Sequence, residues 1–102
     1  MSAVTVSDNP AASRFEARID GALAGFVDYE LADATVAFTH TIVDPAFGGR
    51  GVGSALARYA LDHVRADGTR KAVPICPFIK AWVERNPEYL ALTSSDHLSR
   101  AD

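Results

Sequence analysis

The chain has 102 residues, enough for one domain, and its 48% hydrophobic and 23% charged residues are ordinary for a soluble globular protein. A net charge of -3 without a basic run argues against nucleic acid as a partner. One cysteine fits a reducing compartment, and the sequence shows neither an apolar run of membrane-spanning length nor a signal peptide. We therefore expect a cytoplasmic protein that does not bind membranes.

Three strands are predicted in the N-terminal half. Residues 1–12 show no sustained periodicity, which predicts a loose tail ahead of a single domain at residues 13–92. From Arg14 onward, apolar and polar side chains alternate with the period of two that is typical of half-buried strands. The predicted strands, which form an antiparallel meander, are Arg14–Ile19, Ala22–Leu31 and Thr35–Val43, joined by turns at Asp20-Gly21 and Ala32-Asp33.

The third predicted strand carries a candidate site residue, His40. If the strand is regular, Val36, Phe38, His40 and Ile42 share one of its faces. Two interpretations of His40 are open. It is either a packed histidine with a hydrogen-bonded ring or a general base for an amine, since imidazole titrates near neutral pH.

An amphipathic helix is predicted after the third strand, over residues 51–66. Its apolar residues recur at the spacing of a core-facing stripe, and Asp67-Gly68 supplies the glycine common just past a helix end. A short strand, Lys71–Ile75, follows and is expected to pair in parallel with Thr35–Val43 through a right-handed crossover. The predicted stripe consists of Val52, Leu56, Ala57, Ala60, Leu61 and Val64.

The last predicted helix begins at Pro77, a residue favoured at helix starts, and stops at Pro87. Residues 88–92 are expected to add one turn, and residues 93–102 a polar C-terminal tail. The predicted order is βββαβα, an α+β fold with a mostly antiparallel sheet.

A cluster of glycines, Gly48, Gly49, Gly51 and Gly53, lies between the third strand and the first helix. Glycines allow a ligand close to the backbone, and the unpaired N–H groups and dipole of a helix start favour phosphate. A plain loop ending in a helix cap gives the same local pattern. The cluster lacks the Gly-Lys-Ser/Thr ending of a P-loop and the Gly-x-Gly-x-x-Gly spacing of dinucleotide-binding folds.

The glycine segment resembles the pyrophosphate-binding segment of the GNAT superfamily of acetyl-CoA-dependent N-acetyltransferases, Gln/Arg-x-x-Gly-x-Gly/Ala. Both glycines of that pattern are present, and Gly48 replaces its first residue. The order of further motifs resembles a small single-domain GNAT-like subgroup, over about residues 13–92. The segments that carry this likeness are His40-Thr41-Ile42-Val43, Gly48-Gly49-Arg50-Gly51-Val52-Gly53, Pro74-Ile75-Cys76-Pro77-Phe78-Ile79 and Asn86-Pro87-Glu88-Tyr89.

The resemblance implies a shortened GNAT fold, in which the third and fourth predicted strands part and admit the pantetheine arm of CoA. It implies acetyl-CoA as the cosubstrate and an amine as the acetyl acceptor, which the sequence does not identify further. The residues that it places at the cosubstrate are Ile42 and Val43, through their backbone, and Gly48, Gly49, Arg50, Gly51, Val52, Gly53 and Ser54.

Cys76 is the second candidate for catalysis. It precedes the helix that starts at Pro77, where the helix dipole lowers a thiol pKa. A nucleophile that carries the acetyl group and a small buried filler are both compatible with this position. Tyr89 resembles, by its late position, the tyrosine that protonates the departing thiolate in many GNATs, although a packing role fits it as well. No set of Cys, His, Asp and Glu has metal-ligand spacing.

Two other classes of function stay open beside an acyltransferase. Because Gly48 departs from the family pattern, the chain also fits a catalytically silent CoA-binding or protein-interaction module. The third possibility is a protein of another family that binds the phosphates of a nucleotide. The sequence does not indicate an oligomeric state.

Overall fold

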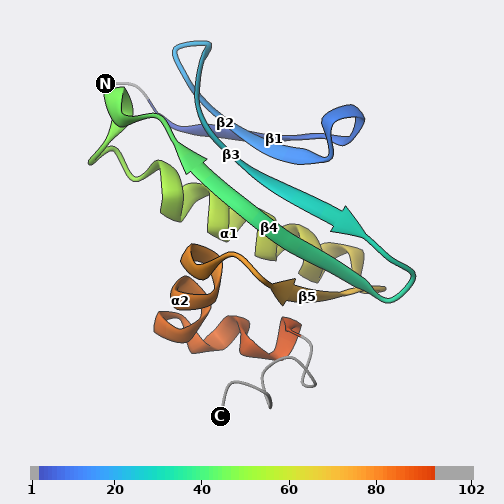
Figure 1. Ribbon diagram of the computed structural model, residues 1–102. Coiled ribbons are helices and arrows are strands. Elements are labelled where there is room, and N and C mark those ends of the chain that lie inside the picture. Colours follow the sequence, from blue (N-terminus) through green and yellow to red (C-terminus); the bar gives the residue numbers. More distant parts are fainter. Residues whose placement is uncertain (1–2, 94–102) are drawn as a thin grey trace.

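A computed structural model describes residues 3–93. The strands among them form one five-stranded sheet with the order β1-β2-β3-β4-β5 (Figure 1). The strands are β1 (Thr5–Asn9), β2 (Arg14–Ile19), β3 (Ala22–Leu31), β4 (Thr35–Val43) and β5 (Lys71–Pro74). The helices are α1 (Val52–Asp67) and α2 (Pro77–Arg85), with 3-10 turns at Pro10–Ala12, Pro45–Phe47 and Pro87–Leu92. β1 to β4 pair antiparallel and β5 pairs parallel to β4. The predicted α+β class and the parallel last strand are confirmed.

The N-terminal segment differs from the prediction of a loose tail at residues 1–12. Residues 5–9 form β1, an edge strand paired antiparallel with β2 from Thr5 opposite Arg18 to Asn9 opposite Arg14. Val4 and Val6 pack against the core, while Thr5 is exposed. Two valines make too short an alternation to stand out in the sequence, so tertiary packing rather than local pattern fixes this strand.

The C-terminal prediction of a polar tail at residues 93–102 is wrong at its first residue. Thr93 is buried, forms a parallel bridge with Ala72 of β5, and bonds through its hydroxyl to the Leu90 carbonyl at 2.6 Å. Residues 94–102 lie outside the described residues.

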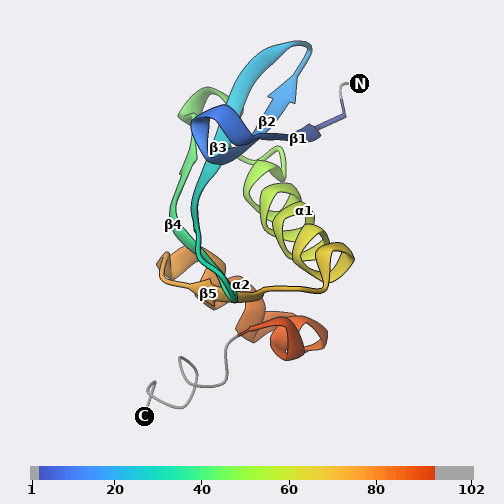
Figure 2. The same ribbon diagram turned by 90° about the vertical axis from the view of Figure 1, so that its right-hand side faces the viewer.

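The core lies between the sheet and α1, which runs along one face of β1 to β4 (Figure 2). Glycines in the left-handed conformation bracket the helix, Gly51 at its start with φ 76° and Gly68 at its end with φ 72°. The predicted stripe is confirmed, since the buried residues of α1 are Val52, Leu56, Ala57, Ala60, Leu61 and Val64. The opposite face of β2 and β3 has no helix over it among the described residues.

A β-bulge in β4 overturns the predicted arrangement of its side chains. Asp28 pairs with His40 but Tyr29 pairs with Phe38, so Thr39 is an extra residue in β4. An extra residue reverses the alternation of faces beyond it. Phe38 is therefore fully buried against α1, whereas His40 is exposed on the helix-free face, together with Ile42, which is 51% exposed.

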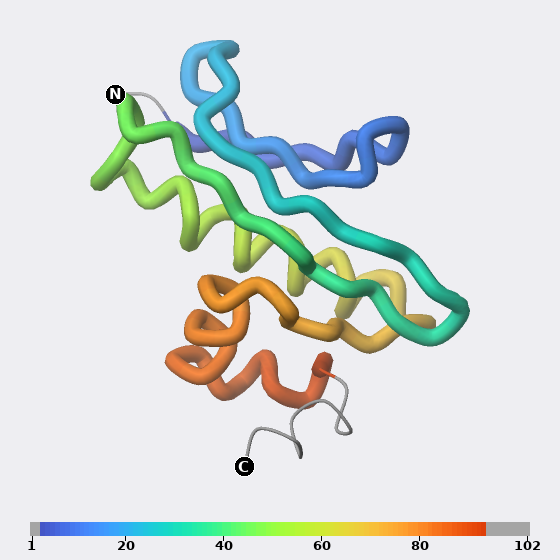
Figure 3. Tube along the Cα trace, viewed as in Figure 1, coloured from blue at the N-terminus to red at the C-terminus, as the bar shows by residue number. Residues whose placement is uncertain are grey.

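β4 and β5 part halfway along β4. Their register runs from Thr35 opposite Lys71 to Phe38 opposite Pro74, and the Cys76 N–H then donates to the Phe38 carbonyl at 2.9 Å. Beyond that bond the chain turns into α2, and the last five residues of β4 have no β5 partner, as the two diverging paths in Figure 3 show. The predicted opening between these strands is present.

Glu16 anchors the helix-free face of β2. Its side chain is buried and accepts hydrogen bonds from Arg14 Nε at 2.7 Å, Arg18 at 3.0 Å and Asn9 Nδ2 at 3.1 Å. The bonds from Arg14, Asn9 and Arg18 favour the carboxylate more than burial opposes it, and they lower the pKa of Glu16 to about 2.

The lowered pKa of Glu16 predicts a pH-dependent contribution to stability. The carboxylate contributes fully above its ordinary pKa of 4.5, and the contribution is lost as the pH falls toward 2. Glu16→Gln should therefore lower the urea midpoint of unfolding at pH 7, and the gap to the wild type should narrow between pH 4.5 and pH 2. Glu84→Gln, which changes an exposed side chain of α2, is the control. A gap that stays constant over this range would contradict the assignment.

Candidate acyl-transfer site

The glycine turn joins the end of β4 to α1. Asp44 starts it by accepting a hydrogen bond from the Ala46 N–H at 2.9 Å, and the turn is then tightened by bonds from the N–H groups of Gly48 and Arg50 to the carbonyls of Pro45 and Phe47. Two of the predicted phosphate donors, the N–H groups of Gly48 and Arg50, are thus already used inside the turn.

The free donors lie slightly further along the chain. The first helical bond runs from the Ala55 N–H to the Gly51 carbonyl at 3.0 Å, which leaves the N–H groups of Val52, Gly53 and Ser54 without a backbone acceptor among residues 3–93. The N–H of Gly49 also has no such acceptor there. These groups, at the positive end of the α1 dipole, form a cradle that fits an anion.

The four glycines of the cluster serve different purposes. Gly49 and Gly51 have φ of 78° and 76°, and a Cβ on either would meet only open space. Gly48 has an ordinary φ of -59°. A Cβ on Gly53 would come within 2.8 Å of the Phe78 ring, so this glycine lets the starts of α1 and α2 approach each other. The side chains of Arg50 and Ser54 are exposed.

The backbone of β4 borders the opening between β4 and α2. The Ile42 carbonyl points toward β3, because a Cβ on Gly25 would lie 2.6 Å from it, and the Asp44 N–H donates to the Ala24 carbonyl. Backbone alternation then directs the polar groups of Thr41 and Val43 to the other side, toward the opening left by β5. Of the two predicted backbone contacts, Val43 therefore faces the opening and Ile42 does not, while Thr41 takes its place.

Cys76 lies at the opposite wall of this opening. It is 5% exposed, and its Sγ is 3.2 Å from the Oγ1 of Thr41, with which it forms a hydrogen bond. Burial raises the pKa of the Cys76 thiol, but the Thr41 hydroxyl and the N–H groups of Ile79 and Phe78 at the start of α2 outweigh it, so the pKa lies below its ordinary value. These two N–H groups stabilise the negative charge of the thiolate, although the Cys76 side chain forms no capping hydrogen bond with the helix.

The two candidate catalytic side chains lie on opposite sides of β4. Thr41 faces Cys76, and the neighbouring residue His40 points to the helix-free face, where it lies opposite Asp28 in the strand pairing. A hollow of about 340 Å³ lies beyond His40, where β3 begins and β4 ends. Its lining includes Leu23, Phe26, Ile42 and Pro45.

Tyr89 lies away from the opening. Its side chain is buried, its hydroxyl donates to Asp62 of α1 at 2.9 Å, and its ring contacts Trp82 with a centroid distance of 5.2 Å. The hydrogen bond and the ring contact give Tyr89 a packing role between α1, α2 and the last 3-10 turn.

Sequence reasoning missed Thr41 and Phe78 as parts of the site. Both belong to motifs singled out in the sequence, but only the bulge at Thr39 turns Thr41 toward Cys76, and only the helix contact places Phe78 on Gly53. Neither contact leaves a periodic signal in the sequence.

Comparison with known protein families agrees with this geometry. The family model of the GCN5-related N-acetyl-transferases matches residues 14–92, and the chain belongs to that family. Curated proteins offer no match to the chain. Within residues 3–93, no three His, Cys, Asp or Glu side chains are grouped so that they could hold a metal ion, and no helix is both long and apolar enough to span a membrane.

The contact between Thr41 and Cys76 predicts a shift in thiol reactivity. Thr41→Val keeps the size of the side chain but removes the hydroxyl that favours the thiolate, so the pKa of Cys76 should rise. The pH dependence of iodoacetamide labelling, which follows the thiolate, measures this pKa. Thr39→Val is the matched control, because the Thr39 hydroxyl bonds to the Asp28 carbonyl instead. Equal labelling midpoints for Thr41→Val and the wild type would contradict the assigned role.

Proposed function

We propose that the protein binds acetyl-CoA and transfers its acetyl group to an amine. The observation that carries the proposal is the free N–H cradle at the start of α1, directly beside the unpaired backbone of β4, in a member of the GCN5-related family. The cradle suits the pyrophosphate of CoA. The backbone of Thr41 and Val43 suits the amides of its pantetheine arm, because an extended chain can pair there in place of a fifth-strand continuation.

In the proposed reaction, the acetyl group arrives at the opening between β4 and α2, and the amine approaches from the helix-free face. The acceptor nitrogen forms a bond to the acetyl carbon while the bond from that carbon to the CoA sulfur breaks, and the sulfur leaves as a thiolate. His40 accepts the proton from the attacking nitrogen. The exposure of His40 and its position opposite the carboxylate of Asp28 support this role.

Cys76 serves in this scheme as a wall of the opening. Its sulfur is buried and bonded to Thr41, on the other side of β4 from His40. A second route, in which the Cys76 thiolate first takes the acetyl group and passes it to the amine, is favoured by the lowered pKa of this thiol.

A pair of glycine substitutions tests the cradle. Gly51→Ala and Gly68→Ala each place a Cβ on a left-handed residue at one end of α1, and each should destabilise the protein by about 1 kcal/mol. Gly51→Ala should in addition weaken CoA binding at least tenfold in calorimetric titration, because its Cβ enters the open space where phosphate would lie. Gly68→Ala should bind CoA as the wild type does. Equal CoA affinities for the two variants would place the phosphates elsewhere.

Substitution of Cys76 separates the direct and covalent routes. Direct attack predicts that Cys76→Ala and Cys76→Ser keep turnover within a few-fold of the wild type, with an amine acceptor and acetyl-CoA. The covalent route instead requires both variants to lose turnover while they retain CoA affinity, and requires the wild type to gain an acetyl group on Cys76 that mass spectrometry detects. His40→Gln should lose turnover under either route and bind CoA normally. Normal turnover of His40→Gln would remove it as the base.

A further inference from the structure

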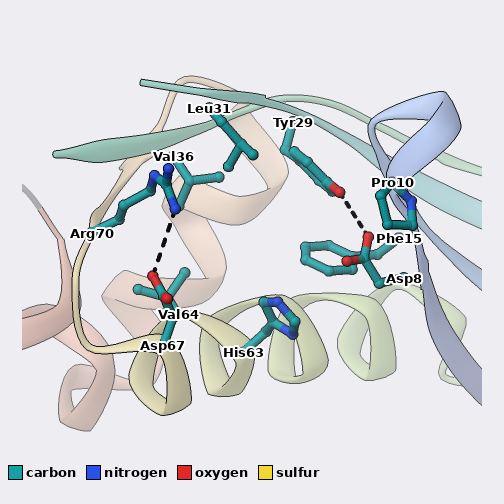
Figure 4. Close-up of a pocket in the computed structure, with 10 residues that line it drawn as sticks. All are labelled: Asp8, Pro10, Phe15, Tyr29, Leu31, Val36, His63, Val64, Asp67 and Arg70. Carbon is teal, nitrogen blue, oxygen red and sulfur yellow. Dashed lines mark hydrogen bonds and ion pairs between the residues drawn. The ribbon is translucent and has the colours of Figure 1, made fainter. Parts of the chain in front are cut away.

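A second cavity lies far from the acyl-transfer opening, between the C-terminal half of α1 and the sheet. Figure 4 shows it closed on one side by Tyr29, Asp8 and Phe15, and on the other by Val36, Leu31 and Arg70, with His63 of α1 beneath. Its volume is about 180 Å³. A protein cavity of about 150 Å³ holds benzene, so this one has room for a compact organic group. His63 is twelve residues beyond Gly51, about 18 Å along the helix axis.

The charged side chains of this cavity are not all paired. Asp8 accepts a hydrogen bond from the Tyr29 hydroxyl at 2.7 Å, and no cationic side chain pairs with it among residues 3–93. Burial and the neighbouring Asp8 raise the pKa of Tyr29 to about 12, so Tyr29 is a neutral donor. At the other side of the cavity, Arg70 donates to the Ala32 carbonyl at 2.7 Å and lies 3.9 Å from Asp67. The carboxylate of Asp8 is thus the charge left without compensation.

Aromatic rings line the cavity on the side of Asp8 (Figure 4). The Phe15 ring lies 4.9 Å from the Tyr29 ring and 5.2 Å from the His63 ring, measured between centroids. The Phe15 ring also contacts Phe38 and Tyr59, so it is packed among other rings and adds apolar surface to the wall of the cavity. The remaining wall is apolar, from Val36, Val64 and Leu31. A carboxylate in a cavity with aromatic and apolar walls complements an ammonium ion that carries small alkyl groups, and it disfavours anions.

We propose that this cavity is a binding site for a small alkylammonium ion, whose charge lies beside Asp8 and whose alkyl groups contact the apolar wall that includes Phe15. The site is independent of the proposed acetyl transfer. The bond between Asp8 and Tyr29 also ties β1 to β3, but that structural role needs only an acceptor oxygen. An asparagine would supply the oxygen without the charge, and this difference separates a structural carboxylate from a binding one.

The test is a titration of the full chain with n-butylammonium chloride, followed by two-dimensional NMR at pH 8. Saturable shifts are expected at Asp8, Tyr29 and His63, with magnetisation transfer from the alkyl protons to the Phe15 ring. Sodium chloride at equal ionic strength and neutral 1-butanol, which has a similar alkyl chain, are the control ligands. The proposal expects butylammonium to bind at least tenfold more tightly than 1-butanol.

Asp8→Asn should weaken butylammonium binding at least tenfold, and Glu84→Gln, an equal change of net charge at an exposed position of α2, should leave it unchanged. If Asp8→Asn does not fold, the comparison of butylammonium with 1-butanol on the wild type decides alone. The proposal is overturned if 1-butanol binds as tightly as the ammonium ion, if Asp8→Asn keeps the wild-type affinity, or if the shifts map outside the cavity. CoA binding by the same samples reports separately on the acyl-transfer site.

Discussion

The separation of β4 from β5 is the constraint on which the site depends. β5 cannot follow β4 further, because the proline at position 77 fixes φ, lacks an N–H and starts α2 one residue after the Cys76 N–H has bonded to Phe38. The bulge at Thr39 coincides with this point and turns Thr41 toward the opening. Two local irregularities at the same level of the sheet thus produce an opening with a thiol on one wall and free backbone on the other.

The regular parts of the fold could be predicted from the sequence, because their signals are periodic. The stripe of α1 and the alternation from Arg14 to Leu31 each repeat several times, and the structure confirms both elements. β1 could not be predicted, because Val4 and Val6 pack against the core only in the folded protein and are too few to form a pattern in the sequence. The reversal of faces in β4 was equally invisible, because one extra residue in a ladder depends on the partner strand rather than on local propensity.

The sequence indicated where in the chain the candidate site lies, but not which of its backbone groups are available to a ligand. The glycines correctly marked the turn before α1, yet the sequence does not say which N–H groups the turn itself consumes. Gly48 and Arg50 use theirs inside the turn, whereas those of Ser54 and Val52 have no backbone acceptor among residues 3–93. Likewise, the family resemblance implied backbone contacts of Ile42 and Val43 with a cosubstrate, but only the pairing with β3 shows that Ile42 turns its carbonyl away from the opening. Such details depend on hydrogen bonds between segments distant in the chain.

The two edge strands of the sheet are poor templates for pairing with another chain. An edge strand exposes backbone groups that can recruit another chain, and long, flat edges are the most prone to do so. Here β1 has five residues and runs directly into Pro10, while β5 has four and ends in a proline at position 74. Since proline offers no N–H and short edges give few bonds, neither border is a good template for strand-by-strand growth. The outermost strands therefore offer another chain little backbone to pair with, and the longer unpaired stretch is the end of β4, between β3 and α2.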